Sequence, residues 1–147
     1  MKCALELITI KEVAETKYLM EEELKDAEAR EWYKTICNDT INLCDTTIND
    51  KLISLATNRK QIKVSYKVVF SEDRLNNKLF RFVKATDKRY ADGRISCCPM
   101  GSYYSFDTLQ TYLSEHCINL ECLADEYDWY GYGTYNCVLI TISIPTE

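Results

Sequence analysis

The clearest pattern along the chain is a stripe of apolar side chains in its first 60 residues. Its members are three or four positions apart, the spacing that places side chains on one face of an α-helix. They are Tyr33, Cys37, Ile41, Cys44, Ile48, Leu52 and Leu55. The stripe predicts a helix over residues 27–56. Several Thr, Asn and Asp residues lower its intrinsic helix propensity, so packing must supply much of its stability.

A second helix is indicated before this stripe. Thr9 and Glu12 have the spacing of a capping box, which marks the start of a helix. Ile8 and Val13 flank this pair and fit a hydrophobic staple. We expect a helix that begins just after Thr9 and runs into the acidic stretch 21–23, either separate from the second helix or part of one long bent helix.

The period of the pattern changes from 3.6 to 2 after residue 60. Apolar and polar residues alternate over 61–70, which predicts a strand with one buried face. A second strand is expected over 79–84 and a short third strand over 94–98. Polar residues over 71–77 and the sequence Ala-Asp-Gly at 91–93 predict turns between them.

The last third of the chain predicts one helix and two further strands. Ser105 is expected to cap a helix over 106–117. A strand over 118–123 and a β-branched strand over 136–144 follow. Between them, residues 125–135 form an expected loop that is rich in Gly, Tyr and acidic residues.

The expected order of elements is α-α-β-β-β-α-β-β. This order predicts a single α+β domain over residues 1–147, in which the helices pack with a mainly antiparallel sheet. The length suits one domain, and 46% hydrophobic residues exclude a disordered chain. No apolar run approaches the ~18 residues of a membrane span. The N-terminus lacks the apolar core of a signal peptide, so we expect a cytoplasmic protein with no membrane partner.

Charge is sorted along the sequence. Residues 1–58 have a net charge of −5, residues 59–96 of +7 and residues 97–147 of −7. In the middle segment, cations alternate with aromatic and other apolar residues on predicted strands, so they would project from one sheet face. This candidate basic patch consists of Lys63, Lys67, Lys78, Arg81, Lys84, Arg89 and Arg94.

Three interpretations of the basic patch stay open. Its charges are solvated or compensated within the fold, or they face an acidic protein partner, or they bind nucleic acid. Interleaved aromatic residues are compatible with base stacking. The acidic isoelectric point near 5.0 weighs against nucleic acid.

The expected acidic loop is the best candidate partner-binding site. Trp and Tyr dominate the binding energy of protein interfaces. The candidate residues are Asp125, Glu126, Asp128, Trp129, Tyr130 and Tyr132. Two alternatives stay open: the aromatic rings fold back onto the core, or the row of carboxylates imitates a nucleic-acid backbone, as an inhibitor of a basic groove would.

Little in the sequence points to catalysis. His116 is the only histidine, and its neighbour Cys117 would point about 100° away on a helix. No phosphate-binding glycine motif is present. We therefore expect a protein that is not an enzyme and that needs no cofactor.

The chain contains eight cysteines, which we expect to be reduced core residues because free Cys behaves as a small hydrophobe. Disulfides or metal binding are the alternatives, although no Cys-x-x-Cys pair is present to favour zinc. The cysteines are Cys3, Cys37, Cys44, Cys97, Cys98, Cys117, Cys122 and Cys137.

Two parts of the chain together resemble a family. They are ITIKEVAE at 8–15, before a long helix and a basic strand, and LQTYLSEHCINLE with YNCVLITISI at 109–121 and 135–144. This layout resembles small proteins encoded by bacteriophages and other viruses, in which a helix pair leads into a β-α-β tail. The resemblance implies non-enzymatic roles, namely virion assembly or the blocking of a host defence machine. It transfers no site residues, because these proteins share no common function.

These observations favour a viral interaction protein in the host cytoplasm or the virion. The preferred hypothesis is a structural or assembly component that self-associates, since surfaces of opposite charge on one chain favour head-to-tail contacts. One alternative is an inhibitor of a host defence complex or nuclease, similar to an anti-CRISPR protein. The other is a nucleic-acid-binding module that uses the basic strands over 61–94.

Overall fold

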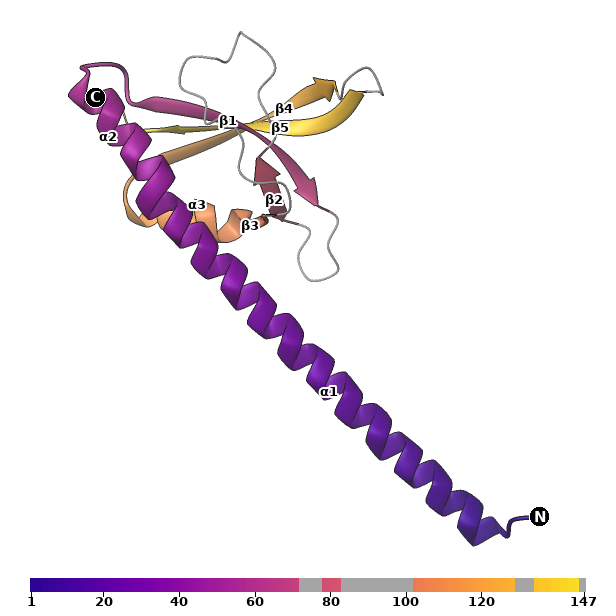
Figure 1. Cartoon of the computed structure of the whole chain (residues 1–147). Helices are drawn as coiled ribbons and strands as arrows, with labels where there is room; N and C mark the ends of the chain where they lie inside the picture. The colour runs from indigo at the N-terminus through magenta and orange to yellow at the C-terminus, as the bar shows by residue number, and fades with distance from the viewer. Residues whose placement is uncertain (72–77, 83–101, 129–133, 146–147) are drawn as a thin grey trace. The chain divides into compact units, whose positions relative to one another are not determined.

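The computed structural model describes residues 1–71, 78–82, 102–128 and 134–145. The chain divides into two compact units, residues 1–35 and 36–147. The elements, labelled in Figure 1, are α1 (Ala4–Leu43), η1 (Cys44–Ile48), α2 (Asn49–Thr57), β1 (Lys63–Ser71), β2 (Leu79–Phe82), β3 (Tyr104–Ser105), α3 (Phe106–Glu115), β4 (Asn119–Asp128) and β5 (Thr134–Ser143). The first unit is helical, and the sheet lies in the second.

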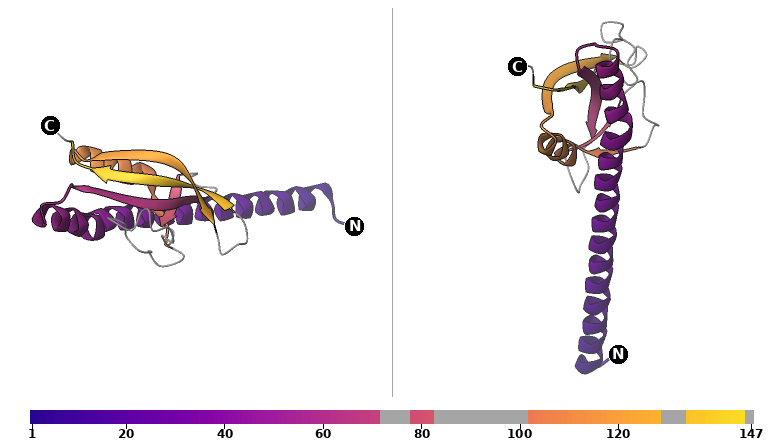
Figure 2. Two further views of the ribbon diagram at one scale, coloured as in Figure 1. Left: turned by 90° about the horizontal axis from the view of Figure 1, so that it is seen from above. Right: turned by 90° about the vertical axis from the view of Figure 1, so that its left-hand side faces the viewer.

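The strands form one antiparallel sheet of five strands in the order β3-β2-β1-β5-β4. β1 lies in its centre, with Val68 opposite Phe82 of β2 and Tyr66 opposite Ile140 of β5. The sheet curves strongly, as the two views of Figure 2 show. The predicted α+β class with an antiparallel sheet is therefore confirmed.

One face of this sheet carries the core of the second unit. The buried face predicted for β1 is confirmed, because Val64, Tyr66 and Val68 are at most 1% exposed, although Lys67 on the other face is also only 6% exposed. They pack with Ile48 of the helical segment and Leu109 of α3. Both helical segments therefore cover the same sheet face, as the two-layer α+β arrangement requires.

The helical stripe seen in the sequence is confirmed as well. All of its members are buried or half-buried, and the helix runs from Ala4 to Thr57 without a break. A π-helical turn, Cys44–Ile48, interrupts the α-helical hydrogen bonding inside the stripe. Such turns insert an i→i+5 bond into an α-helix and often mark functional positions. The two expected helices are thus one helix with a π-turn.

The expected start of the first helix is wrong. The helix begins at Ala4, so Thr9 lies inside it, and its hydroxyl donates to the Leu5 carbonyl at 3.0 Å instead of capping. Threonine within a helix commonly donates its hydroxyl to the carbonyl four residues earlier, and Thr9 does so here. Ile8 and Val13, expected to form a staple, are 52% and 64% exposed.

The expected loop over 125–135 is shorter than the sequence indicated. β4 continues to Asp128 and β5 begins at Thr134, with Asp125 opposite Cys137 and Asp128 opposite Thr134. Backbone pairing with β5 outweighs the low strand propensity of acidic residues, because strand propensity depends strongly on context.

Two further details concern the shorter elements. Ser105 caps α3 as expected, and its hydroxyl accepts from the Thr108 amide at 3.2 Å. The third strand of the sheet is Tyr104–Ser105, which pairs with β2 and was not predicted. The expected strand over 94–98 and the expected turn over 91–93 lie outside the described residues.

Thr40 offers a test of how the helix is joined to the sheet. Its side chain is fully buried; its hydroxyl donates to the Ile36 carbonyl at 2.8 Å and accepts from the Ser105 amide at 2.8 Å. Thr40→Val keeps the shape but removes the acceptor, so we expect a loss of about 1–3 kcal/mol in urea unfolding. Thr46→Val is the control, because the Thr46 hydroxyl donates to the Asn42 carbonyl of its own helix at an exposed position. Equal losses in both variants would contradict this role.

Candidate functional site

The first unit is a helix whose large apolar side chains are exposed. Single apolar residues on a surface are normal, whereas a contiguous set marks an interaction site. The exposed side chains, between 38% and 74% accessible, are Leu5, Leu7, Ile8, Ile10, Val13, Tyr18, Leu19, Met20, Leu24 and Trp32. This helix is therefore the strongest candidate interface among the described residues.

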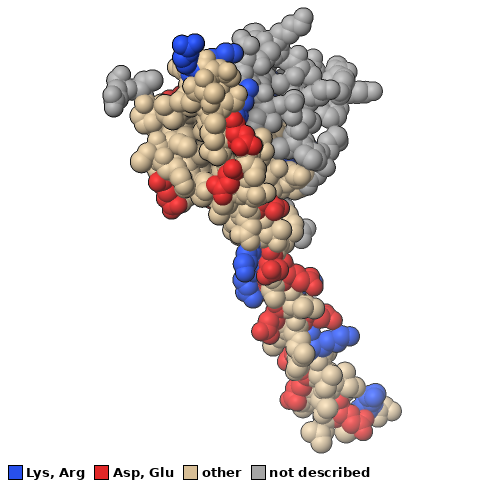
Figure 3. Space-filling view, turned by 60° about the vertical axis from the view of Figure 1, so that its left-hand side comes forward, with Lys and Arg blue, Asp and Glu red and all other residues tan. Residues whose placement is uncertain are grey.

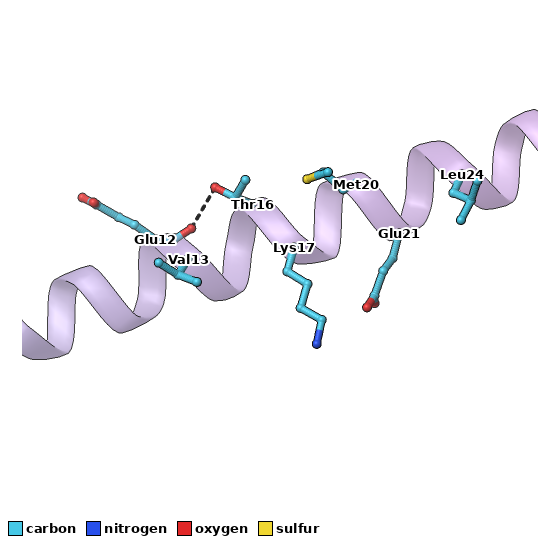
Figure 4. Close-up of a pocket in the computed structure, with 7 residues that line it drawn as sticks. All are labelled: Glu12, Val13, Thr16, Lys17, Met20, Glu21 and Leu24. Carbon is cyan, nitrogen blue, oxygen red and sulfur yellow. Dashed lines mark hydrogen bonds between the residues drawn. The ribbon is translucent and has the colours of Figure 1, made fainter.

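A shallow groove follows one side of this helix (Figure 4). Val13, Met20 and Leu24 supply its apolar part, and Thr16 and Lys17 lie between them. All the residues that line it belong to one helix, so the groove has no opposite wall. Small-molecule sites are concave and bury most of the ligand. The groove therefore suits the side chains of another protein segment better than a small ligand.

The charges on this helix are mixed and mostly solvated. Figure 3 shows acidic and basic side chains interspersed along it. Lys11 lies 3.8 Å from Glu15, and Lys25 lies 3.6 Å from Glu22. Exposed pairs of this kind contribute little stability. Residues 1–35 contain nine acidic and six basic residues, a balance that does not favour binding to phosphates.

Three cations of the predicted basic patch lie on the sheet face opposite the core. Lys63 and Lys67 alternate with the buried residues of β1, and Arg81 lies opposite Val69 across the β1–β2 ladder. Lys63 and Arg81 are exposed, but Lys67 is only 6% exposed. These three cations share one face, although Lys67 offers little surface to a partner, and a binding role for them stays a prediction.

The fourth described cation of the patch is compensated within the chain. Lys78 donates to the Asp107 carboxylate of α3 at 3.0 Å. This contact supports internal compensation for that one residue. The remaining members lie outside the described residues, and a binding role for the patch stays a prediction: Lys84, Arg89 and Arg94.

The structure describes only the acidic part of the predicted partner-binding site. Asp125, Glu126 and Asp128 belong to β4, which lies at the edge of the sheet and, among the described strands, pairs only with β5. The aromatic members Trp129, Tyr130 and Tyr132 lie outside the described residues. The site stays a prediction, but its acidic part is held on a strand and not in a loop.

A polar group at the π-turn was not anticipated from the sequence. The Tyr112 hydroxyl donates to the Asp45 carboxylate, which raises the pKa of Tyr112 to about 12. Nδ1 of His116 lies 2.8 Å from the Tyr112 carbonyl oxygen, and the two rings are 4.4 Å apart. The hydrogen bond between Tyr112 and Asp45 joins α3 to η1. Because the phenol stays protonated at neutral pH, it acts as a hydrogen-bond donor and not as a base.

The described cysteines are buried, exposed or, in the case of Cys37, half-buried. Cys44 and Cys137 are buried as expected, while Cys3, Cys117 and Cys122 are exposed, so the expectation of core cysteines is wrong for these three. Cys3 precedes α1, Cys117 lies between α3 and β4, and Cys122 lies on the edge strand β4. The six cysteines of the described residues are free thiols. Burial raises the pKa of the Cys44 thiol to about 12 and also raises that of Cys122.

In the described part of the chain, no group of three His, Cys, Asp or Glu side chains could hold a metal ion. No helix there has both the length and the apolar character to cross a membrane.

Comparison with known proteins found no matching family model, no matching curated protein and no matching solved structure. The surface chemistry described above is therefore the basis for a functional proposal.

The Tyr112 contact can be tested by titration. Asp45→Asn removes the carboxylate that holds the phenolic proton, so we expect the pKa of Tyr112 to fall from about 12 toward its ordinary value of 10.0. The contact stabilises the fold below pH 10, and this contribution is lost as the pH rises toward 12. NMR of ¹³C-labelled tyrosine reports the pKa. Asp107→Asn on α3 is the control, and an unchanged pKa in Asp45→Asn would refute the assignment.

The cysteine environments predict an order of thiol labelling. Cys44 is 4% exposed and has a raised pKa, so it should react only when the protein unfolds. Cys3 and Cys117 are exposed and should react in the native state. Peptide mass spectrometry after timed alkylation measures each rate. Labelling of native Cys44 as fast as Cys117 would contradict its burial and revive a reactive-thiol enzyme as an alternative.

Proposed function

We propose that this chain is a non-enzymatic protein that acts through protein–protein contacts, as a structural or assembly component of a virus- or phage-type particle. The observation that supports this proposal most directly is the exposed apolar surface of helix residues 4–24. Many exposed large apolar side chains within one short segment are typical of interfaces. The virus-type part of the proposal depends on the resemblance in layout to small phage-encoded proteins.

The water-exposed apolar area of this helix favours association with a partner. Val13, Met20 and Leu24 are 60–66% exposed. Full burial of such a side chain is worth about 1.5–3 kcal/mol, so covering the exposed part of each contributes roughly 1–2 kcal/mol. Several of them together offset part of the loss of translational and rotational freedom on association. A partner helix or groove that covers this face is therefore favoured.

One observation favours a second candidate function. β4 is an edge strand with Glu121, Asp125, Glu126 and Asp128 within ten residues, and the chain has no Lys or Arg after Arg94. An acidic strand edge could occupy a basic groove, which supports the inhibitor of a host defence complex or nuclease. The nucleic-acid module has less support, because Lys78 is paired with Asp107 and Lys67 is buried.

Sedimentation velocity of the full chain over a range of concentrations tests the proposal. We expect species larger than the monomer at tens of micromolar protein. They should persist at high salt, because screening weakens charge contacts but not apolar ones. A chain that is monomeric at all concentrations and salts would contradict self-association. Capture of one host protein by that monomer, lost on reversal of the β4 charges, would favour the inhibitor.

A further inference from the structure

We propose that helix residues 10–27 pair antiparallel with the same segment of a second copy of this chain. The inference rests on the proposed function and deepens it by naming the partner and the pairing. Three features of the helix carry it: the spacing of its apolar residues, a single cation within the apolar stripe, and an acidic residue placed beside that cation.

The spacing is that of a coiled-coil seam. Successive members of the stripe are 3, 4, 3, 4 and 3 positions apart, the alternation of a and d positions in a heptad. They are Ile10, Val13, Lys17, Met20, Leu24 and Ala27, and all are exposed. The stripe is about 26 Å long at 1.5 Å per residue. Such a narrow apolar seam is the pattern with which two helices pair, whereas a helix facing a globular core has a wider stripe.

A neighbouring face of the helix is less continuous. Leu7, Ala14 and Tyr18 also have heptad-like spacing, but Lys11 interrupts them and Glu21 ends them. Grooves follow both faces, through Val13 and Leu24 on the first and through Ala14 and Tyr18 on the second. The first stripe is apolar at five of its six positions and the second at three of five, so the pairing is assigned to the first.

The position of Lys17 in the stripe favours an antiparallel over a parallel pair of helices. In a parallel pair each a residue faces its own copy, so two Lys17 ammonium groups would meet inside the seam. The flanking residues Glu23 and Glu28 would also meet in that arrangement, as g and e positions do. Like charges in contact are destabilising. The parallel pair is therefore disfavoured at its centre and along its edge.

The antiparallel pair resolves this conflict. It places Val13 opposite Leu24, Lys17 opposite Met20 and the large Ile10 opposite the small Ala27. The ammonium group of Lys17 then lies beside Glu21 of the second copy, and the two-fold symmetry makes this contact twice. In the structure Lys17 and Glu21 project from the same side of the helix, as Figure 4 shows. Reversal of the helix direction thus gives charge complementarity.

Directed cross-linking of the full chain tests the orientation. A mixture of Val13→Cys and Leu24→Cys chains should form a disulfide between positions 13 and 24, because opposed seam residues come within disulfide range. Val13→Cys alone should not link to itself, since the two copies of position 13 lie about 16 Å apart along the antiparallel seam. Peptide mass spectrometry identifies the linked positions and separates them from links through native cysteines. A 13–13 link would show a parallel pair and overturn the inference.

A matched pair of substitutions tests the face. Met20 and Leu19 are adjacent and equally exposed, at 66% each, but only Met20 lies in the stripe. We expect Met20→Glu to weaken self-association at least about tenfold and Leu19→Glu by less than about threefold, with circular dichroism showing the same helix content in both. Equal weakening would overturn the inference. Association without the 13–24 link would also overturn it while leaving the proposed function standing, whereas a strictly monomeric chain that captures no partner would end both.

Discussion

Along one continuous helix, the apolar side chains are exposed in the first part and buried in the second. From Ile36 onward the described helix has a face packed into the core, with Leu43, Cys44 and Ile48 almost inaccessible to water. In residues 4–24 of the same helix, large apolar side chains are exposed. Removal of apolar surface from water is the main favourable term in folding and association. The first unit is therefore where a partner gains most, and both proposals depend on this difference.

The second unit has a different chemical character. In its core, the side chains of Tyr66, Leu109 and Ile140 are each at most 1% exposed to water. The two side chains there with the largest pKa shifts, Cys44 and Tyr112, stay protonated at neutral pH. At that pH neither side chain is therefore in the charged form that acts as a nucleophile or a base. The second unit serves in this account as a folded body, and the acidic edge strand β4 is its most distinctive surface.

Much of the fold could be predicted from periodicity, because periodicity reports which face of an element is buried. The buried helix face from Tyr33 to Leu55 and the buried face of β1 were both predicted correctly. Predictions from local sequence motifs were wrong where the same groups could form other hydrogen bonds. Thr9 fits a capping box, but within the helix its hydroxyl bonds the Leu5 carbonyl, and cross-strand pairing extends β4 through residues that disfavour strands. The Asp45–Tyr112 contact joins residues 67 positions apart, which no local pattern reveals.

The candidate site was less accessible from the sequence, since an apolar stripe does not say whether its own chain covers it. Only the exposure of Val13, Met20 and Leu24 distinguishes this helix from a core helix. Hydrogen exchange of the full chain, measured at several protein concentrations, tests that distinction most directly. The account predicts that backbone amides over residues 10–27 become more protected as concentration rises, while those of β1 do not change. Protection over 10–27 that is independent of concentration would contradict it.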